Sequence, residues 1–199
     1  MRDRARHPRR RARLYQGPPP RRQKGHAHGR TVQPHRRHRR GPGPGARHHQ
    51  ARPVIRLPDP FFRTIADEAE DAYPMECCGL FVGRRKDAGD DVLITRVQPS
   101  PNVAGGDRRG SFLVDAKIQF DMMRELGDGP EQIVGHYHSH PDHPPRPSDR
   151  DKQSVYYPDH VWVIIGVEDG HAGEIAAYLF DHAADQFQQV DIVTGNPGN

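Results

Sequence analysis

The sequence contains the stretch Gly135-His136-Tyr137-His138-Ser139-His140-Pro141, followed after six residues by Ser148-Asp149-Arg150-Asp151. The stretch continues the apolar pair Ile133-Val134, which indicates the end of a buried strand. Because side chains along a strand alternate between its two faces, we expect His138 and His140 to point to the same side. A carboxylate from the segment that follows could fold back toward these two rings.

Two imidazoles and one carboxylate would make a metal site with three protein ligands, His138, His140 and Asp151. Two nitrogen ligands and one oxygen ligand suit Zn²⁺, and a fourth position stays open for water, as in catalytic zinc sites. The alternative is a histidine-rich loop without a metal, since the chain has 14 histidines and 20 prolines. A chance match to His-x-His-Pro with Ser and Asp at these offsets has a probability on the order of 10⁻⁴, which favours the metal site.

The length and the cysteine content restrict the class of protein. A chain of 199 residues allows one ordinary domain with a tail. The sequence has no apolar run long enough to span a bilayer, and no apolar stretch follows the basic N-terminus as in a secretory signal. The two cysteines, Cys77 and Cys78, are adjacent, and adjacent cysteines rarely form a disulfide. We therefore expect a protein of the reducing cytoplasm, without a membrane partner.

Charge is distributed very unevenly along the chain. Residues 1–53 hold 17 Lys and Arg and one acidic residue, for a net charge of +16, whereas residues 54–199 have a net charge of −12. The first segment is rich in Arg, His, Pro and Gly and has almost no apolar residues, so we predict that it is a disordered arm. Contacts to nucleic-acid phosphates are one role open to it. We favour the alternative that it is a passenger segment without a part in the activity.

Residues 54–195 are predicted to form one α/β domain, a single curved mixed sheet flanked by helices, and residues 196–199 a polar tail. Apolar spacing and turn residues predict helices at 59–72, 116–126 and 148–157. The same signals predict strands at 76–83, 91–97, 111–114, 132–138, 160–166, 175–180 and 187–193.

A hydrolytic metal site also needs a base, and the helical His-Glu-x-x-His pattern that carries its own base is absent. Glu76 is the candidate, because it opens a predicted buried strand where a carboxylate without a function would be costly. The alternative is an ordinary charge at an exposed strand end. Ser148 and Asp151 also have a simpler interpretation, since Ser with Asp three residues later suits a capping box at a helix start. A cysteine nucleophile is disfavoured, because Cys77 and Cys78 are expected in the core.

The sequence resembles the JAMM (MPN+) family of zinc metallopeptidases, in its compact bacterial form, through two motifs. They are Glu76-x-Cys78-Gly79-Leu80 and Gly135-x-Tyr137-His138-Ser139-His140-Pro141 with Ser148 and Asp151 at the offsets given above. Members of the family also have segments similar to Asn102, Phe112-x-Val114-Asp115 and Trp162-x-Ile164-Ile165 at the same places. The resemblance therefore covers about residues 54–193. It implies the MPN/JAB fold, which is cytidine-deaminase-like. One departure is His136, which stands where many members have Trp or an apolar residue and which we expect to be packed in the strand.

The resemblance implies a role for each of five residues. His138, His140 and Asp151 would hold one Zn²⁺ ion per chain. Glu76 would accept the proton of a zinc-activated water and pass it to the leaving amine. Ser148 would donate a hydrogen bond to the oxyanion of the tetrahedral intermediate.

The resemblance also implies a substrate class. Compact bacterial members are associated with small sulfur-carrier proteins of ubiquitin-like fold, whose diglycine tail they free. The first hypothesis is therefore a metallopeptidase that cleaves an amide or isopeptide bond at the C-terminal tail of such a carrier, and the second is an isopeptidase for another ubiquitin-like modifier. A non-catalytic scaffold of the same fold is a third hypothesis, which the complete set of five residues argues against. A nucleic-acid-binding protein acting through residues 1–53 is the fourth.

Overall fold

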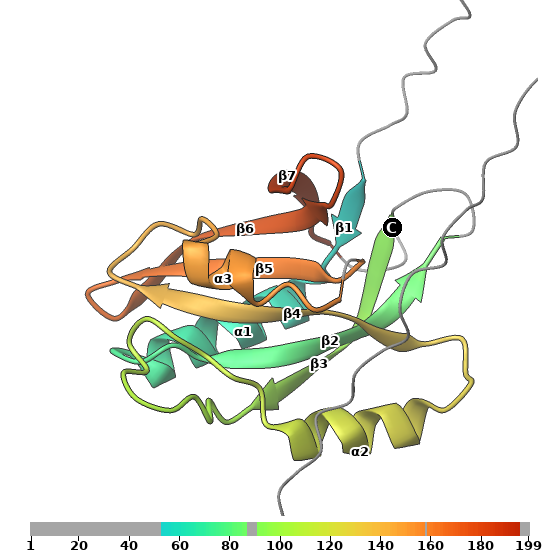
Figure 1. The fold of residues 1–199 in the computed structure, drawn as a ribbon, viewed down its shortest axis with the longest axis horizontal. Helices are drawn as coiled ribbons and strands as arrows, with labels where there is room; N and C mark the ends of the chain where they lie inside the picture. The colour runs from blue at the N-terminus through green and yellow to red at the C-terminus, as the bar shows by residue number, and fades with distance from the viewer. Residues whose placement is uncertain (1–52, 87–90, 158, 196–199) are drawn as a thin grey trace, which may run out of the picture. The chain divides into compact units, whose positions relative to one another are not determined.

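The computed structural model describes residues 53–86, 91–157 and 159–195. The predicted tail at 196–199 and the predicted arm, apart from Pro53, lie outside these residues. Figure 1 shows the sheet and the helices that the described residues form.

The sheet is mixed, as predicted, and it closes into a barrel with the strand order β1-β3-β2-β4-β5-β6-β7. The strands are β1 (Val54–Arg56), β2 (Cys78–Arg85), β3 (Val92–Ser100), β4 (Gln132–Pro141), β5 (Val161–Glu168), β6 (His171–Asp181) and β7 (Gln186–Val193). Neighbours are antiparallel except for the parallel pairs β1/β3, β1/β7 and β4/β5. Closure depends on β1, which the sequence does not predict, because three residues are too few to show a period of two.

The helices of the described residues are α1 (Asp59–Ala72), α2 (Ala116–Leu126) and α3 (Asp149–Gln153). Figure 1 shows α1 behind the sheet and α3 in front of it, so helices flank the sheet, as predicted. Ile65 and Ala69 of α1 are buried in the core, and full burial of a side chain such as Ile65 contributes roughly 1.5–3 kcal/mol to folding. Within the described residues, no helix has both the length and the apolar character needed to cross a membrane.

Several predicted strands have shifted bounds, such as β6, which begins at His171 instead of residue 175, and two predicted elements differ more from the structure. The strand predicted at 111–114 is reduced to a single bridge between Val114 and Asn102, and the helix predicted at 148–157 ends at Gln153. In place of a strand contact, the ring of Phe112 stacks on His138, with the ring centroids 4.2 Å apart. These two residues are far apart in the sequence, so no local pattern indicates the contact.

The side chains of β4 alternate between two environments. Tyr137 is fully buried in the core that α1 covers, and its hydroxyl donates a hydrogen bond to Glu68 of α1. Gly79 of β2 is required beside Tyr137, because a Cβ at this position would overlap the tyrosine ring. His138 and His140 lie on the opposite face of β4, as the period of two predicts.

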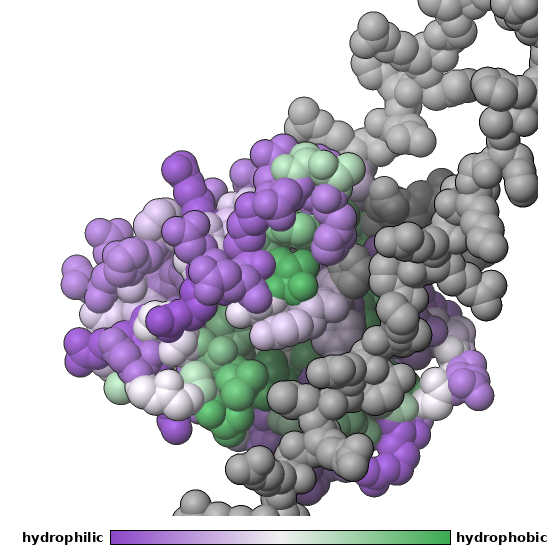
Figure 2. Space-filling view, in the orientation of Figure 1, coloured by the Kyte–Doolittle hydropathy of each residue, from purple (hydrophilic) through white to green (hydrophobic). Residues whose placement is uncertain are grey.

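The surface around α3 is mainly hydrophilic (Figure 2). Hydrophobic side chains are visible below it, over the segment that leads from β3 to α2. The exposed large apolar residues of that segment are Val103 and Leu113. The candidate site lies between α3 and this segment, because the first turn of α3 and the ring of Phe112 both contact the β4 histidines.

Candidate metal centre

Three potential metal ligands from β4 and the start of α3 come together: His138, His140 and Asp151. Their exposed fractions are 0% for His138, 9% for His140 and 5% for Asp151. The two Nε2 atoms are 3.0 Å apart. Nε2 of His138 lies 3.4 Å from Oδ1 of Asp151, and Nε2 of His140 lies 3.6 Å from Oδ2. The fold thus brings together all three residues that the sequence suggests as ligands.

The spacing of these atoms fits a metal ion. Ligands about 2.0–2.1 Å from an ion at tetrahedral angles lie about 3.3 Å from one another. The three separations above, 3.0, 3.4 and 3.6 Å, bracket this value, the last two being to the two different oxygens of the Asp151 carboxylate. Nδ1 of His140 lies 3.2 Å from the carbonyl of Pro144, to which we assign it as donor, and this leaves the Nε2 lone pair free to bind an ion. Burial lowers the pKa of His138, so its ring is neutral, as a metal ligand must be.

Asp151 is positioned by the first turn of α3. Ser148 is the N-cap, and its hydroxyl oxygen accepts from the backbone N–H of Asp151 at 3.2 Å. In return the Asp151 carboxylate accepts from the backbone N–H of Ser148 at 2.7 Å, so the predicted capping box is confirmed. Burial alone would raise the pKa of Asp151, but the two adjacent histidine rings and the hydrogen bond from the Ser148 hydroxyl outweigh it and hold the pKa well below its ordinary range. The carboxylate is therefore ionised and able to bind a cation.

Glu76 lies just before β2 and is 6% exposed. Its backbone N–H donates to the carbonyl of Arg108 at 2.8 Å, and its carbonyl accepts from the side-chain amide of Asn102 at 3.0 Å. The side chain lines a pocket of about 270 Å³ together with His140 and Ser148. Burial raises the pKa of Glu76 to about 8, although the nearby His140 lowers it. Glu76 can therefore bind or release a proton close to neutral pH.

The side chain of Asn102 links the backbone of Glu76 to the loop between β3 and α2 through hydrogen bonds. Its amide nitrogen donates to the carbonyls of Glu76 and Ser111, at 3.0 and 2.9 Å. Its amide oxygen accepts from the backbone N–H groups of Ala104 and Leu113. The residue pattern does not indicate this role, because asparagine is common in turns. The match of Asn102 to the family pattern is the only signal that could have pointed to it.

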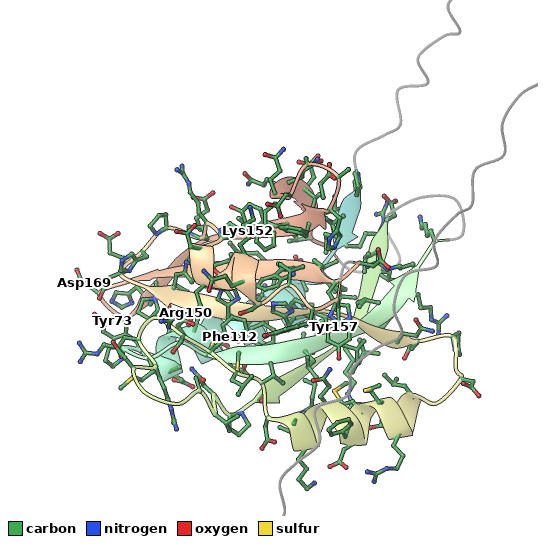
Figure 3. The ribbon with its side chains drawn as sticks, viewed as in Figure 1. Tyr73, Phe112, Arg150, Lys152, Tyr157 and Asp169 are labelled. Carbon is green, nitrogen blue, oxygen red and sulfur yellow. The ribbon has the colours of Figure 1, made fainter. Side chains whose placement is uncertain are left out.

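An aromatic cluster packs against the first candidate ligand. Phe112 stacks on His138, and the ring of His136 meets Trp162 edge-on with centroids 4.1 Å apart. Figure 3 shows Phe112 near α3, close to Arg150. Among the described residues, the buried side-chain nitrogens without a hydrogen-bond partner are Nε2 of His136, Nδ1 of His138 and Nε1 of Trp162. All three nitrogens belong to this cluster, and no protein atom of the described residues forms a hydrogen bond with them.

We predict that His136→Phe stabilises the protein. Phenylalanine keeps a ring against Trp162 and removes a buried nitrogen that has no partner within the described residues. An unpaired buried polar group costs about 1–3 kcal/mol, so the free energy of unfolding, measured with urea in the presence of a chelator, should rise by about 1 kcal/mol. The control His171→Phe, at an exposed position of β6, should change it by less than about 0.5 kcal/mol. A loss of stability in His136→Phe would show that an ordered water satisfies this nitrogen.

The structure does not support Cys77, Cys78 or Ser139 as a nucleophile. Cys77 and Cys78 are buried, and burial raises the pKa of each thiol to about 12. Ser139 is fully buried, and its hydroxyl oxygen accepts from the backbone N–H of Cys77 at 2.9 Å. The two cysteines are therefore core residues, as predicted.

Comparison with known proteins places this geometry in a family. Residues 58–181 match the family model of prokaryotic homologues of the JAB domain. A desampylase of Haloferax volcanii is 26% identical over 119 residues, which are 60% of this chain and 78% of that protein. The solution structure of a Desulfitobacterium hafniense protein is similar with a TM-score of 0.61 and 28% identity, covering 71% of this chain and 93% of that one. A Salinibacter ruber protein has a TM-score of 0.55 and 29% identity, covering 72% and 93%. Since the family model spans more than half of the sequence, the chain belongs to the prokaryotic homologues of the JAB domain, a compact form of the JAMM/MPN family.

Proposed function

We propose that this chain is a zinc-dependent metallopeptidase that hydrolyses an amide or isopeptide bond at the C-terminal tail of a ubiquitin-like protein, with sulfur carriers as the substrate class. The observation that carries the proposal is the buried group of His138, His140 and Asp151 beside the pocket lined by Glu76 and Ser148. We also propose that the catalytic domain spans residues 54–195 and acts in the cytoplasm. The two free, buried cysteines agree with a reducing compartment.

In the proposed mechanism His138, His140 and Asp151 would hold one Zn²⁺ ion. Bound there, the ion would supply Lewis-acid chemistry to the scissile carbonyl and to a water molecule. Glu76 accepts the proton of the attacking water and later delivers it to the nitrogen of the leaving amine. A group that both accepts and donates a proton works best with a pKa near the operating pH. The value of about 8 for Glu76 is close to that range, and a neighbouring cation would move it lower.

Ser148 is the proposed donor to the oxyanion. Its side chain is exposed at the mouth of the pocket, and its hydroxyl donates to Oδ2 of Asp151 at 2.7 Å. To reach an oxyanion, the hydroxyl must rotate away from Asp151. The backbone N–H of Ser148, 2.7 Å from the same oxygen, then continues to hold the carboxylate. The capping role and the catalytic role are therefore compatible.

One comparison and the resemblance of the motifs support the choice of substrate. The Haloferax volcanii relative is named a desampylase, which favours hydrolysis at the tail of a ubiquitin-like modifier. The motifs around Glu76 and His138 resemble those of the compact sulfur-carrier peptidases, which is the basis for choosing a sulfur carrier.

We test the proposal with the full chain loaded with Zn²⁺ and a diglycine-tailed sulfur carrier extended by one residue. Mass spectrometry of the carrier should show release of this residue, loss of release after treatment with a chelator, and recovery when Zn²⁺ is returned. His138→Ala, assayed in parallel, accounts for zinc bound by the seven histidines of residues 1–53. If the zinc-loaded protein cleaves neither this carrier nor an isopeptide-linked one, the proposal is wrong and a scaffold of the same fold remains.

A further inference from the structure

The pocket beside Glu76 carries two arginines that the proposed mechanism does not use. Arg109 and Arg146 line this space of about 270 Å³ together with Glu76, His140 and Ser148. Its volume lies just below the roughly 300–1,000 Å³ of ligand pockets. The pocket therefore suits one amino-acid residue better than the surface of a folded protein.

Both arginines are available to a ligand. Arg109 and Arg146 are exposed, and within the described residues neither guanidinium group makes a hydrogen bond or an ion pair. Their neighbours Arg108 and Arg150 differ, since each donates to a backbone carbonyl of the loop after β3. Figure 3 shows Arg150 of α3 beside this loop. Arg109 and Arg146, whose guanidinium groups make no such bond within the described residues, are the two arginines of the pocket lining.

The charged side chains of the pocket lining are mostly basic. Residues 54–199 have a net charge of −12, yet the lining holds Arg109 and Arg146 and a single acidic residue, Glu76. Asp107 lies two residues before Arg109 in the sequence. Asp107 accepts a hydrogen bond from the backbone N–H of Arg109 at 3.0 Å, so its carboxylate is engaged locally. The pocket therefore favours an anionic group.

The position of Glu76 indicates which part of the substrate enters the pocket. In the proposed mechanism Glu76 delivers a proton to the leaving amine, so that amine must lie next to the Glu76 carboxyl. The atoms that follow the amine in the substrate then occupy the pocket that Arg109 and Arg146 also line. When the leaving group is a single C-terminal residue, its carboxylate carbon is only two bonds from the amine nitrogen. A guanidinium group matches a carboxylate through two parallel hydrogen bonds.

We propose that Arg109 and Arg146 form a subsite for the free α-carboxylate of a single C-terminal residue, which the enzyme releases from the tail of the carrier. The inference rests on the proposed function and adds the chemical group that the leaving residue must carry. In the reaction, the bond between the glycine carbonyl carbon and the amine nitrogen breaks, and the oxygen of water bonds to that carbon. A proton of the water reaches the nitrogen through Glu76. The products are a carrier that ends in diglycine and a free amino acid.

Two carriers that differ only in their last group test this subsite. Each has one alanine after the diglycine, with a free C-terminal carboxylate in one and a C-terminal amide in the other. The zinc-loaded full chain should cleave the acid with a kcat/KM about 10- to 100-fold above that of the amide, the range expected for charge-assisted hydrogen bonds. Arg109→Gln and Arg146→Gln should each lower kcat/KM for the acid and leave the amide unchanged. The control Arg124→Gln, on α2 and outside the pocket lining, should keep the preference.

Binding without turnover provides a second readout. In a Glu76→Gln background, calorimetry should show that the acid carrier binds more tightly than the amide carrier. Adding Arg109→Gln should remove this difference, whereas adding Arg124→Gln should not.

Three outcomes would overturn the subsite. Equal cleavage and equal binding of the two carriers would show that the carboxylate is not recognised, while the cleavage itself would support the proposed function. A preference for the acid that survives in both arginine variants would assign the recognition to other groups. Failure of the zinc-loaded protein to cleave either carrier would contradict the proposed function, and the subsite with it.

Discussion

Glu76→Gln is expected to lower kcat by about 10²- to 10⁴-fold, the usual contribution of a general acid–base group. Glutamine has the same shape but cannot accept a proton from water or deliver one to the leaving amine. Because Glu76 is not one of the three clustered ligands, bound zinc should stay at the wild-type level. The measurement combines a carrier-cleavage assay with elemental analysis of zinc. Glu125→Gln, an exposed carboxylate of α2 that pairs with Arg96, is the matched control and should leave both quantities unchanged.

Glu76→Gln should also change how the free energy of unfolding depends on pH. This effect can be measured without substrate. Burial raises the pKa of Glu76 from 4.5 to about 8, so between these values the folded protein holds a proton that the unfolded chain has released. Its contribution to stability is therefore complete below about pH 4.5 and is lost as the pH rises toward 8. In chelator, the free energy of unfolding of the wild type should fall relative to that of Glu76→Gln between about pH 5 and about pH 8. A kcat within tenfold of wild type, together with parallel stability curves, would assign the proton transfer to another group.

Asp151→Asn is expected to abolish activity by removing the metal. The substitution replaces the charged ligand with a neutral amide of the same shape, and we expect zinc affinity to fall by more than roughly 100-fold, since even indirect partners of a metal ligand contribute 10- to 100-fold. The amide oxygen of asparagine can still accept from the backbone N–H of Ser148, so the start of α3 should be preserved. Zinc affinity is measured by competition with a chelator, and the fold by circular dichroism.

Asp149→Asn is the control for Asp151→Asn. It removes one negative charge from the first turn of α3 without removing a candidate metal ligand. Asp149 is exposed and lies two residues earlier in the same first turn of α3, so its variant should bind zinc and cleave the carrier as the wild type does. The histidines of residues 1–53 are common to all variants, and differences in zinc between them therefore belong to this site. Asp151→Asn protein that keeps one tightly bound zinc would place the third ligand elsewhere.

Local sequence patterns determined much of this site. The period of two along β4 predicts that His138 and His140 share a face, because alternation follows from the geometry of a strand alone. The spacing of Ser148 and Asp151 predicts the capping box, because its two hydrogen bonds join groups only three residues apart. The helix that apolar spacing predicts at 116–126 has the bounds of α2, because the hydrogen bonds of a helix also join residues close in sequence.

Other features were decided only by the tertiary structure. Three such features join segments that are distant in sequence. They are the closure of the barrel by β1, the stacking of Phe112 on His138, and the hydrogen bond from the Asn102 side chain to the carbonyl of Glu76. The pocket that brings Arg109 and Arg146 next to Glu76 is of the same kind. Such contacts form when burial of the core brings whole elements together, and a local pattern of residues records which face of an element is buried, not which distant side chain it will meet.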